Sequence, residues 1–359
     1  MSPEERPANP AGSGRPGRPT TLRDVAEEAR VSIKTVSNVV NDRPNVGPVT
    51  RDRVREVIRR LNYRPQVGAR QMRTGTSGLI TLAIPSLAGS YFSELAQAFA
   101  QGAQARGRSI MLHSTVGGRE EERSVLDGFT RVIGDGVVFN PISIGEDAIA
   151  AMERTIQPTV FIGEHVPDEQ DLPAGSDYVH TDNEQAACDA TTHLWQRGAR
   201  RIAFVGALQV AEAEQAHSTS RLRIAGYRRA LAEAGAAAEP MLQEVDAWTV
   251  EGGIRAVDPL LERFGQVDGI VCGNDELARG VLLALAARRT PVPGRIRVIG
   301  HDDTAEARYT TPTLSSINPD REELVRIVVE LLLERIDGYD GPPRSIIAPH
   351  RLVARASSA

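Results

Sequence analysis

Residues 20–40, TTLRDVAEEARVSIKTVSNVV, constrain the fold more than any other part of the 359-residue chain. They predict two short amphipathic helices that meet at a corner. Thr21 can cap the first helix, and Asp24 follows three residues later, as in a capping box. Apolar residues with the spacing of one inward-facing helical stripe follow at Leu22, Val25, Ala26 and Ala29.

The second predicted helix has two different faces. Ser32 can cap it, directly after the corner formed with Arg30 and Val31. Its inward face consists of Val36, Val39 and Val40, and the side chains pointing away are those of Ile33, Lys34, Thr35, Ser37 and Asn38. A third helix is predicted from Pro48, with core spacing at Val54, Val57, Ile58 and Leu61. Three such helices predict a helix-turn-helix unit.

A family resemblance rests on DVAEEARVSIKTVSNVVND, TRDRV and LNYRP, which resemble the DNA-binding headpiece of the lactose-repressor and galactose-repressor family of bacterial transcription regulators. The resemblance implies that Ile33, Lys34 and Asn38 read bases in the major groove. It implies contacts to the DNA backbone from Thr21, Ser32, Thr35, Ser37, Asn41 and Tyr63. The alternative for each is an ordinary solvated surface residue, or for Ile33 a packing residue.

Two departures from the family pattern bear on DNA recognition. Arg30 replaces the glycine usual at the corner, which costs about 1 kcal/mol if that residue has a positive φ. Asn38 replaces a common arginine, and an asparagine side chain suits adenine better than guanine. The preferred operator is therefore expected to differ from those of arginine-bearing relatives.

Segments on either side of the headpiece (20–65) also resemble DNA-binding parts. Residues 1–19 are predicted to be a disordered basic arm, in which GRPGRP at 14–19 resembles a minor-groove hook, with a plain flexible tail as the alternative. Residues 66–77 match the family's hinge helix, and the resemblance implies that Met72 and Ala69 contact the minor groove, Met72 as a wedge between base steps. A simple linker is the alternative.

Charge is divided unevenly along the chain. Residues 1–77 hold 15 Lys or Arg against 8 Asp or Glu, whereas 78–359 hold 27 against 39. The net charge of −5 therefore hides a basic amino-terminal part. Phosphate contacts supply much of the affinity for DNA, so the positive net charge of residues 1–77 agrees with a nucleic-acid partner. Lys34 is the single lysine of the chain, which hints at a retained chemical role.

Residues 78–359 alternate apolar runs with helical patterns, as in a parallel sheet flanked by helices. The clearest predicted strands are 79–85, 109–114, 136–140, 159–163, 201–206, 269–275 and 297–303. Two series of this kind predict an α/β core of two doubly wound lobes, about 78–176 with 319–345 and 177–318 with 346–359. TDNEQAACDATTHLWQRGARRIAFVG, RLRIAGYRRAL, CGNDELARGVL and VIGHDDT resemble the family's effector-binding core, which is shared with periplasmic sugar-binding proteins.

Ligands of open parallel sheets bind outside the carboxyl ends of the strands, so polar residues at those ends are candidates for an effector site. These are Ser86, Asn140, Asn274 and Asp302. The resemblance adds Tyr91 and Phe92 as walls of the cleft, Arg223 as a clamp with Thr219 beside it, and Trp248 as a stacking surface. This set suits a polyhydroxyl or nucleoside-like ligand. A structural role in the core is the alternative for Trp248, and a helix cap is equally expected for Asp275 and Asp303.

The position after the fourth strand departs from sugar-binding relatives. They often have an aspartate there, whereas this chain has Gly163-Glu164, so the acceptor is expected to be displaced or missing. Cys188 and Cys272 are expected to be buried thiols, and the seven histidines show no ligand spacing, so neither a metal nor a cofactor is expected.

The combination predicts a transcriptional regulator, most simply a repressor, that binds a pseudo-palindromic operator as a homodimer. Two headpieces roughly double the recognition energy of one. An enzyme is disfavoured because no phosphate-loop or nucleophile motif is present, and a secreted solute-binding protein because the polar start predicts no signal sequence. With no membrane-spanning stretch either, a cytoplasmic protein is expected. A phosphorylated partner protein in place of a small effector is the alternative within regulation.

Overall fold

The computed structural model describes residues 20–40, 42–63, 76–128, 134–208, 218–236 and 239–359. The chain divides into two compact units, Met1–Ser77 and Gly78–Ala359, which we describe separately. The predicted contacts at Asn41, Ala69 and Met72 and the hook at 14–19 lie outside the described residues. No helix in the described ranges has the length and apolar character needed to cross a bilayer.

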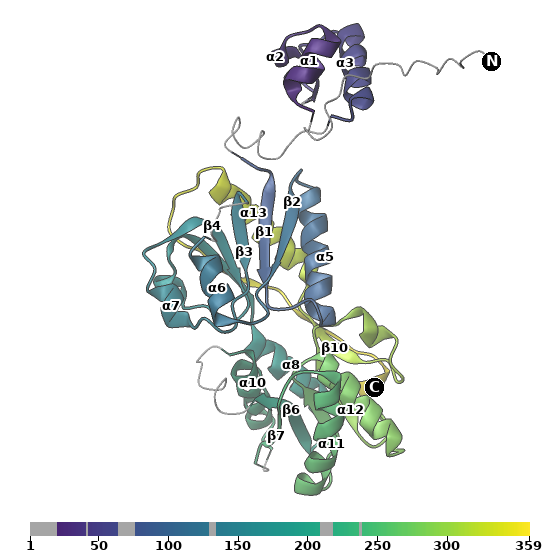
Figure 1. The fold of residues 1–359 in the computed structure, drawn as a ribbon. Coiled ribbons are helices and arrows are strands. Elements are labelled where there is room, and N and C mark those ends of the chain that lie inside the picture. The colour runs from purple at the N-terminus through teal and green to yellow at the C-terminus, as the bar shows by residue number, and fades with distance from the viewer. Residues whose placement is uncertain (1–19, 41, 64–75, 129–133, 209–217, 237–238) are drawn as a thin grey trace, which may run out of the picture. The chain divides into compact units, whose positions relative to one another are not determined.

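The amino-terminal unit is the predicted helix-turn-helix bundle (Figure 1). Its helices are α1 (Leu22–Ala29), α2 (Ile33–Val40) and α3 (Pro48–Arg60). The capping box is confirmed, since the Asp24 amide donates to Thr21 Oγ1 and the Thr21 amide donates to Asp24 Oδ2 at 2.7 Å. The three helices enclose one small apolar core, formed mainly by Val25, Ala26, Ala29, Val36, Val39, Val54 and Val57.

Arg30 ends α1 with φ 51° and ψ 48°, in the left-handed region. A side chain with a Cβ is strained in this conformation, whereas glycine is not. The positive φ expected at this corner is therefore present, and the headpiece folds with an arginine where the conformation favours glycine.

The core unit consists of two lobes, each built on a six-stranded sheet. The first sheet has the order β11-β5-β4-β3-β1-β2, and the second has the order β12-β10-β9-β8-β6-β7. All pairings between these described strands are parallel except that of β10 with β12. The predicted fold class, a helix-turn-helix headpiece with two parallel α/β lobes, is confirmed.

The first lobe comprises β1 (Leu79–Ile84), α5 (Ser90–Gln104), β2 (Ser109–Ser114), α6 (Arg119–Leu126), β3 (Gly136–Phe139), α7 (Glu146–Ala150), β4 (Arg154–Ile162), β5 (Ala174–Thr181), α13 (Arg321–Ile336) and β11 (Ser345–Ala348). A short 3-10 helix, η1 (Glu169–Asp171), lies between β4 and β5. Figure 1 shows α13, from late in the chain, beside the sheet that β1 begins.

The second lobe comprises α8 (Asn183–Gln196), β6 (Ile202–Leu208), α10 (Thr219–Glu233), β7 (Met241–Val245), α11 (Val250–Phe264), β8 (Gly269–Cys272), α12 (Asp275–Ala287), β9 (Arg297–His301), β10 (Ser315–Asn318) and β12 (Arg351–Val353). Two 3-10 helices, η2 (Ala305–Arg308) and η3 (Ala356–Ser358), complete it. The chain passes between lobes after β5, after β10 and after β11. The first sheet thus runs to Thr181 and Ala348, beyond the boundaries expected at 176 and 345.

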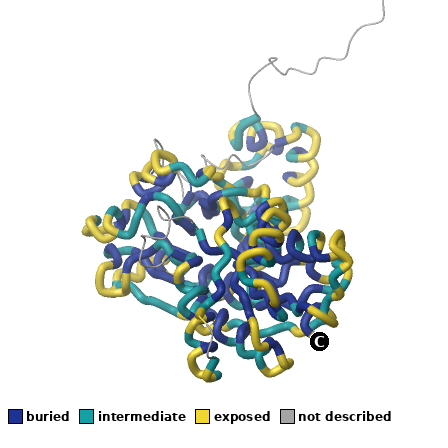
Figure 2. Tube along the Cα trace, turned by 90° about the horizontal axis from the view of Figure 1, so that it is seen from below, coloured by how far each residue is buried: buried dark blue, intermediate teal, exposed yellow. Residues whose placement is uncertain are grey.

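Apolar side chains cover both faces of both sheets, so the central strands are buried, whereas edge strands such as β2 are partly exposed (Figure 2). Cys188 and Cys272 are free and buried, as predicted. No cluster of His, Cys, Asp or Glu suited to a metal ion occurs in the ranges that the structure describes.

A buried ion-pair network joins β5 to the end of α13 and the start of β11 in the first lobe. Asp177 on β5 is fully buried and accepts hydrogen bonds from Arg335 of α13 at 2.8 and 2.9 Å. Arg344, just before β11, adds two guanidinium bonds at 3.0 Å. Burial opposes ionisation of Asp177, but the hydrogen bonds from the two arginines hold its pKa below the ordinary value. This carboxylate therefore ties β5 to the end of α13 and to the residue before β11, which both lie far from it in the sequence.

We predict that Arg30→Gly stabilises the headpiece by about 1 kcal/mol, because glycine adopts the left-handed conformation without strain. Amide hydrogen exchange in α1 and α2 of the full-length protein should slow by about fivefold. The control is Arg53→Gly at an exposed position inside α3, which should speed exchange by a similar factor. Equal effects of the two substitutions would contradict the strain assigned to Arg30.

We predict that Asp177→Asn lowers the free energy of unfolding of the core by about 3 kcal/mol, since it leaves the buried Arg335 and the half-buried Arg344 without their carboxylate. A lowered folded-state pKa means that this stabilisation is present above about pH 4 and is lost as the pH falls through the folded pKa. Urea unfolding followed by circular dichroism at a series of pH values measures both effects.

The control for this network is Asp340→Asn, which breaks an exposed pair with Arg154 and should cost less than about 1 kcal/mol. A destabilisation by Asp177→Asn that stays constant from neutral pH into strong acid would contradict the role assigned to the ionised carboxylate.

Candidate DNA-reading helix and interlobe site

The outward face of α2 is accessible. Ser32 caps the helix by accepting a hydrogen bond from the Thr35 amide at 3.0 Å. Ile33 is 46 % exposed, so it is not a packing residue of the headpiece, and Lys34 beside it is also exposed. Val36 and Val39 point into the core on the opposite side. The first turn of α2 therefore offers one apolar and one cationic side chain to a partner.

The residues expected to contact the DNA backbone differ in their surroundings. The hydroxyl groups of Thr21, Ser32 and Thr35 lie at helix starts and take part in capping contacts. Ser37 is half-buried. Tyr63 is only 7 % exposed and packs in the headpiece core, so a large part of its side chain has a structural role.

On the second lobe, Arg223 occupies the first turns of α10. This helix packs tightly on α8, because a Cβ on Gly226 would lie 1.9 Å from the backbone oxygen of Glu184. The close packing brings Arg223 to Asn183, whose Oδ1 accepts a hydrogen bond from Arg223 Nε at 2.7 Å. Arg223 also donates to the backbone oxygen of Gly273.

Two further side chains of the second lobe flank the Arg223 guanidinium. Asp302 lies 3.9 Å from it, and the ring of Trp248 lies 5.4 Å from its central carbon. Trp248 is fixed by a hydrogen bond from its Nε1 to the Gly206 oxygen at 2.9 Å. Three residues expected to line the cleft, one from α10 and two from separate loops, are thus brought together.

From the first lobe, Glu164 reaches the same place. Its carboxylate accepts hydrogen bonds from Asn183 Nδ2 at 2.6 Å and from Thr219 Oγ1 at 2.7 Å. Asn140 lies beside the preceding residue, since a Cβ on Gly163 would be 2.7 Å from Asn140 Oδ1. Glu164 therefore supplies a carboxylate directly after Gly163, and this carboxylate accepts from groups of the second lobe.

Tyr91, at the start of α5, faces these charges. Burial, and then the charges of Asp302 and Glu164, raise its pKa well above the ordinary value, and Arg321 and Arg223 oppose the shift. We call the group that meets here the interlobe site. Its members are Tyr91, Asn140, Glu164, Asn183, Thr219, Arg223, Trp248 and Asp302.

Burial is the main cause of the pKa shifts of the charged groups in the interlobe site. Burial raises the pKa of Asp302 well above its ordinary value, against the favourable charge of Arg223. Burial likewise lowers the pKa of Arg223 and, together with the charge of Arg223, that of His301. Carboxylate, amide and guanidinium groups here offer hydrogen-bond partners to the hydroxyl groups of a neutral ligand.

Three further residues expected in the site make contacts with the protein itself. Asn274 caps α12, with Oδ1 accepting from the Leu277 amide at 2.9 Å, and its Nδ2 donates to the Trp248 oxygen at 3.3 Å. The Ser86 hydroxyl accepts from the Ala88 amide at 3.0 Å, and Phe92 packs on the first-lobe core and on Tyr91.

The helix caps expected at Asp275 and Asp303 are wrong. Asp275 is buried inside the second lobe, where it accepts from Thr304 and from Ser316 Oγ at 2.6 Å. Asp303 accepts from Arg355 and Asn318. Both aspartates join loops and strands of the second lobe, and α12 is capped by the neighbouring asparagine.

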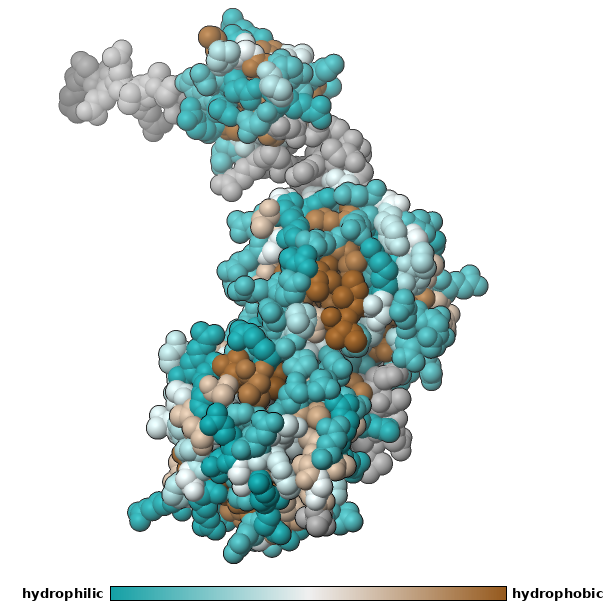
Figure 3. Space-filling model, turned by 180° about the vertical axis from the view of Figure 1, so that it is seen from behind, coloured by the Kyte–Doolittle hydropathy of each residue, from teal (hydrophilic) through white to brown (hydrophobic). Residues whose placement is uncertain are grey.

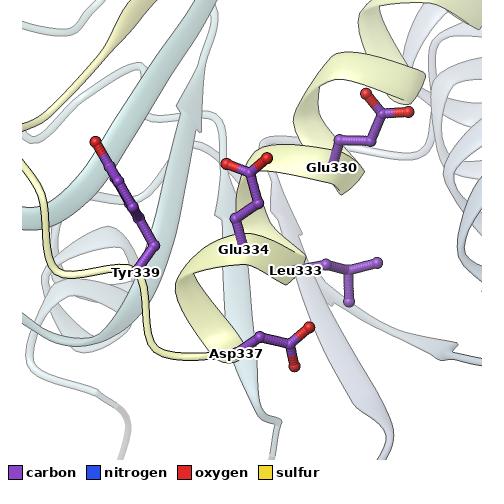
Figure 4. A pocket seen from close by; sticks show the side chains of 5 residues that line it. All are labelled: Glu330, Leu333, Glu334, Asp337 and Tyr339. Atoms are coloured by element: carbon purple, nitrogen blue, oxygen red, sulfur yellow. The ribbon is translucent and has the colours of Figure 1, made fainter.

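A separate hollow of about 450 Å³ lies at the carboxyl end of α13 (Figure 4). Its lining consists of Glu330, Leu333, Glu334, Asp337 and Tyr339. The carboxylates of Glu330 and Glu334 pair with neighbouring arginines, Arg326 and Arg344. The hollow is thus at the opposite end of α13 from Arg321, whose charge acts on Tyr91, and it shares no residue with the interlobe site.

Comparisons with known proteins agree with this architecture. Residues 21–66 match the family described as bacterial regulatory proteins, lacI family, and residues 191–358 match a periplasmic binding protein-like domain. The chain is 31 % identical over 347 residues to the HTH-type transcriptional regulator AscG of Escherichia coli K12, covering 92 % of this chain and 100 % of AscG.

Two solved structures are similar over nearly the whole chain. One is the Lac repressor dimer bound to operator and the anti-inducer ONPF, with TM-score 0.78, 27 % identity, and coverage of 95 % of this chain and 99 % of that one. The other is a complex of the transcriptional regulator CelR with cellobiose, with TM-score 0.64, 26 % identity, and coverage of 94 % and 99 %. The chain therefore belongs to the lacI family: it is a DNA-binding transcriptional regulator with an effector-binding core, and not an enzyme.

Proposed function

We propose that this regulator is a repressor that binds a pseudo-palindromic operator as a homodimer and responds to a small polar ligand in the interlobe site. The observation that carries the regulatory part is the meeting of Arg223, Asp302 and Trp248 of one lobe with Tyr91 and Glu164 of the other. A ligand bound there contacts both lobes, so its binding changes how they are joined. We propose that the protein acts in the cytoplasm, where a bacterial operator lies.

Base reading is assigned to Ile33, Lys34 and Asn38. Lys34 is exposed on the first turn of α2 and can donate to guanine acceptors, and exposed Ile33 can contact a thymine methyl group. Asn38 suits adenine. Thr21, Ser32, Thr35, Ser37, Asn41 and Tyr63 are assigned to the DNA backbone, where contacts fix register without reading sequence.

Two observations support a homodimer: the weak base discrimination of a single headpiece, and the exposed apolar side chains of the core. One headpiece with few base contacts discriminates weakly, whereas two headpieces on two half-sites roughly double the discrimination. Apolar patches appear on one face of the core (Figure 3), and exposed apolar side chains include Leu112, Ile254 and Leu283. Apolar surface of this kind is suited to contact with a second copy.

The ligand is proposed to be a sugar or a nucleoside-like molecule. Arginine, asparagine and carboxylate groups beside an aromatic ring provide the hydrogen bonds and stacking surface that polyhydroxyl ligands require. The CelR structure contains cellobiose, which is one example of such a ligand in a similar protein. Ligand couplings of this type amount to about 1–3 kcal/mol, enough to change operator occupancy several-fold.

We predict that Lys34→Ala weakens binding to the best operator by about tenfold or more, and binding to random DNA only slightly, because a base contact is lost. Fluorescence anisotropy with both duplexes at one salt concentration measures the difference. Arg59→Ala, an exposed cation of α3, is the control and should weaken both about equally. An equal loss on both duplexes for Lys34→Ala would make Lys34 a phosphate contact.

We predict that Arg223→Ala abolishes the response of operator binding to ligand, while operator affinity without ligand changes little. The guanidinium is buried in the interlobe site, and its removal leaves Asn183 Oδ1 without its donor and Asp302 without its neighbouring positive charge. Operator binding measured with and without metabolite pools tests this. Arg228→Ala, an exposed arginine on the same helix, is the control. A normal response in Arg223→Ala would remove Arg223 from the ligand site.

A further inference from the structure

At Glu164 the two lobes are in contact, and the hydrogen-bond donors of its carboxylate come from the protein itself. Glu164 follows β4 in the first lobe, whereas Thr219 is the first residue of α10 in the second lobe. Each oxygen of the carboxylate has its own donor, Asn183 Nδ2 on Oε1 and Thr219 Oγ1 on Oε2. Hydrogen bonds to a charged group are stronger than neutral ones, so this contact favours the joined arrangement of the lobes.

Asn183 extends the contact to the arginine of the ligand site. It lies where the chain first passes from one lobe to the other, directly after β5, and is only 2 % exposed. Its amide nitrogen donates to Glu164 and to the Thr181 oxygen, while its Oδ1 accepts from Arg223 Nε. With both ends of its amide engaged, the side chain has one fixed orientation, and it links Glu164 to Arg223.

A second junction between the lobes lies elsewhere and shares none of these residues. Glu94 of α5 accepts a hydrogen bond from the Ala305 amide of the second lobe at 2.7 Å. Arg321 of α13, which pairs with Glu94 at 2.8 Å inside the first lobe, donates to the Asp303 oxygen of the second lobe at 2.9 Å. Glu276 of α12 accepts from the Ser90 amide at 3.4 Å. If Glu164 controls how the lobes are joined, a change at Glu164 must also loosen this second junction.

We propose that Glu164 is a positioning residue that holds the two lobes together in the ligand-free protein and, through Asn183, fixes Arg223 for the ligand. A ligand that bonds to Thr219 or Arg223 competes with this contact, so occupancy of the site and joining of the lobes are linked through one carboxylate. The inference rests on the proposed role of the interlobe site, but it concerns the ligand-free protein.

The test is hydrogen exchange of the full-length, ligand-free protein, which uses neither DNA nor ligand. Glu164→Ala removes the acceptor, and Thr219→Val removes one donor with little change of shape. Both should speed exchange by about fivefold at the second junction, at the amides of Ser90 and Ala305, as well as locally. Glu169→Ala, an exposed carboxylate of the same loop, is the control and should leave the second junction unchanged.

Two results would overturn the proposal. Faster exchange confined to the neighbourhoods of Glu164 and Thr219 would show a local contact without influence on the lobes, and unchanged exchange would show that the contact does not hold them. Circular dichroism of each variant identifies a general loss of folding, and Thr219→Val keeps the test decisive if Glu164→Ala unfolds. A failure here leaves the proposed ligand site intact, whereas the loss of response in Arg223→Ala tests that site separately.

Discussion

The hydrogen-bonded contact of Asn183 with Arg223 and Glu164 is the interaction on which the arrangement of the interlobe site depends. It exists because α10 packs directly on α8 through Gly226, where no side chain separates the two backbones. The start of α8 is also the point where the chain leaves the first sheet. A single buried amide at this crossing thus connects Arg223 of one lobe with the Glu164 carboxylate of the other.

The separation of roles along the chain follows from charge and burial. The headpiece is a small bundle with a thin core, and the exposed side of α2 is left free for a partner. The lobes are larger and carry the negative charge, and their sheets are covered on both faces. Buried networks such as that of Asp177 keep each lobe intact, so that a ligand can move lobes as units.

The elements of the fold could largely be predicted from the sequence, because apolar periodicity determines them. The stripe on α1, the two faces of α2 and the buried strands such as β1 and β8 all have unambiguous patterns. The positive φ at Arg30 could be predicted because the family places glycine there. Strand β5 was not among the predicted strands, since its sequence AGSDYVHT begins with residues typical of turns, and it runs past the lobe boundary expected at 176.

The candidate site could be predicted only in part, because strand ends reveal which residues are near the site but not where each side chain points. Arg223, Trp248 and Asp302 do meet. Asn274 and Asp275 are neighbours, yet one caps a helix and the other is buried among loops, a difference set by tertiary contacts. Asn183 was missed because its contacts require α8 and α10 to lie side by side, which the sequence does not reveal.

The most direct test of the account is the ratio of affinities for two DNA duplexes at about 150 mM salt. One duplex is the operator selected by the protein from random sequences, and the other is its scrambled counterpart. Sequence-specific reading by paired headpieces predicts affinities that differ by about a thousandfold or more. Equal affinity for the two duplexes would contradict it.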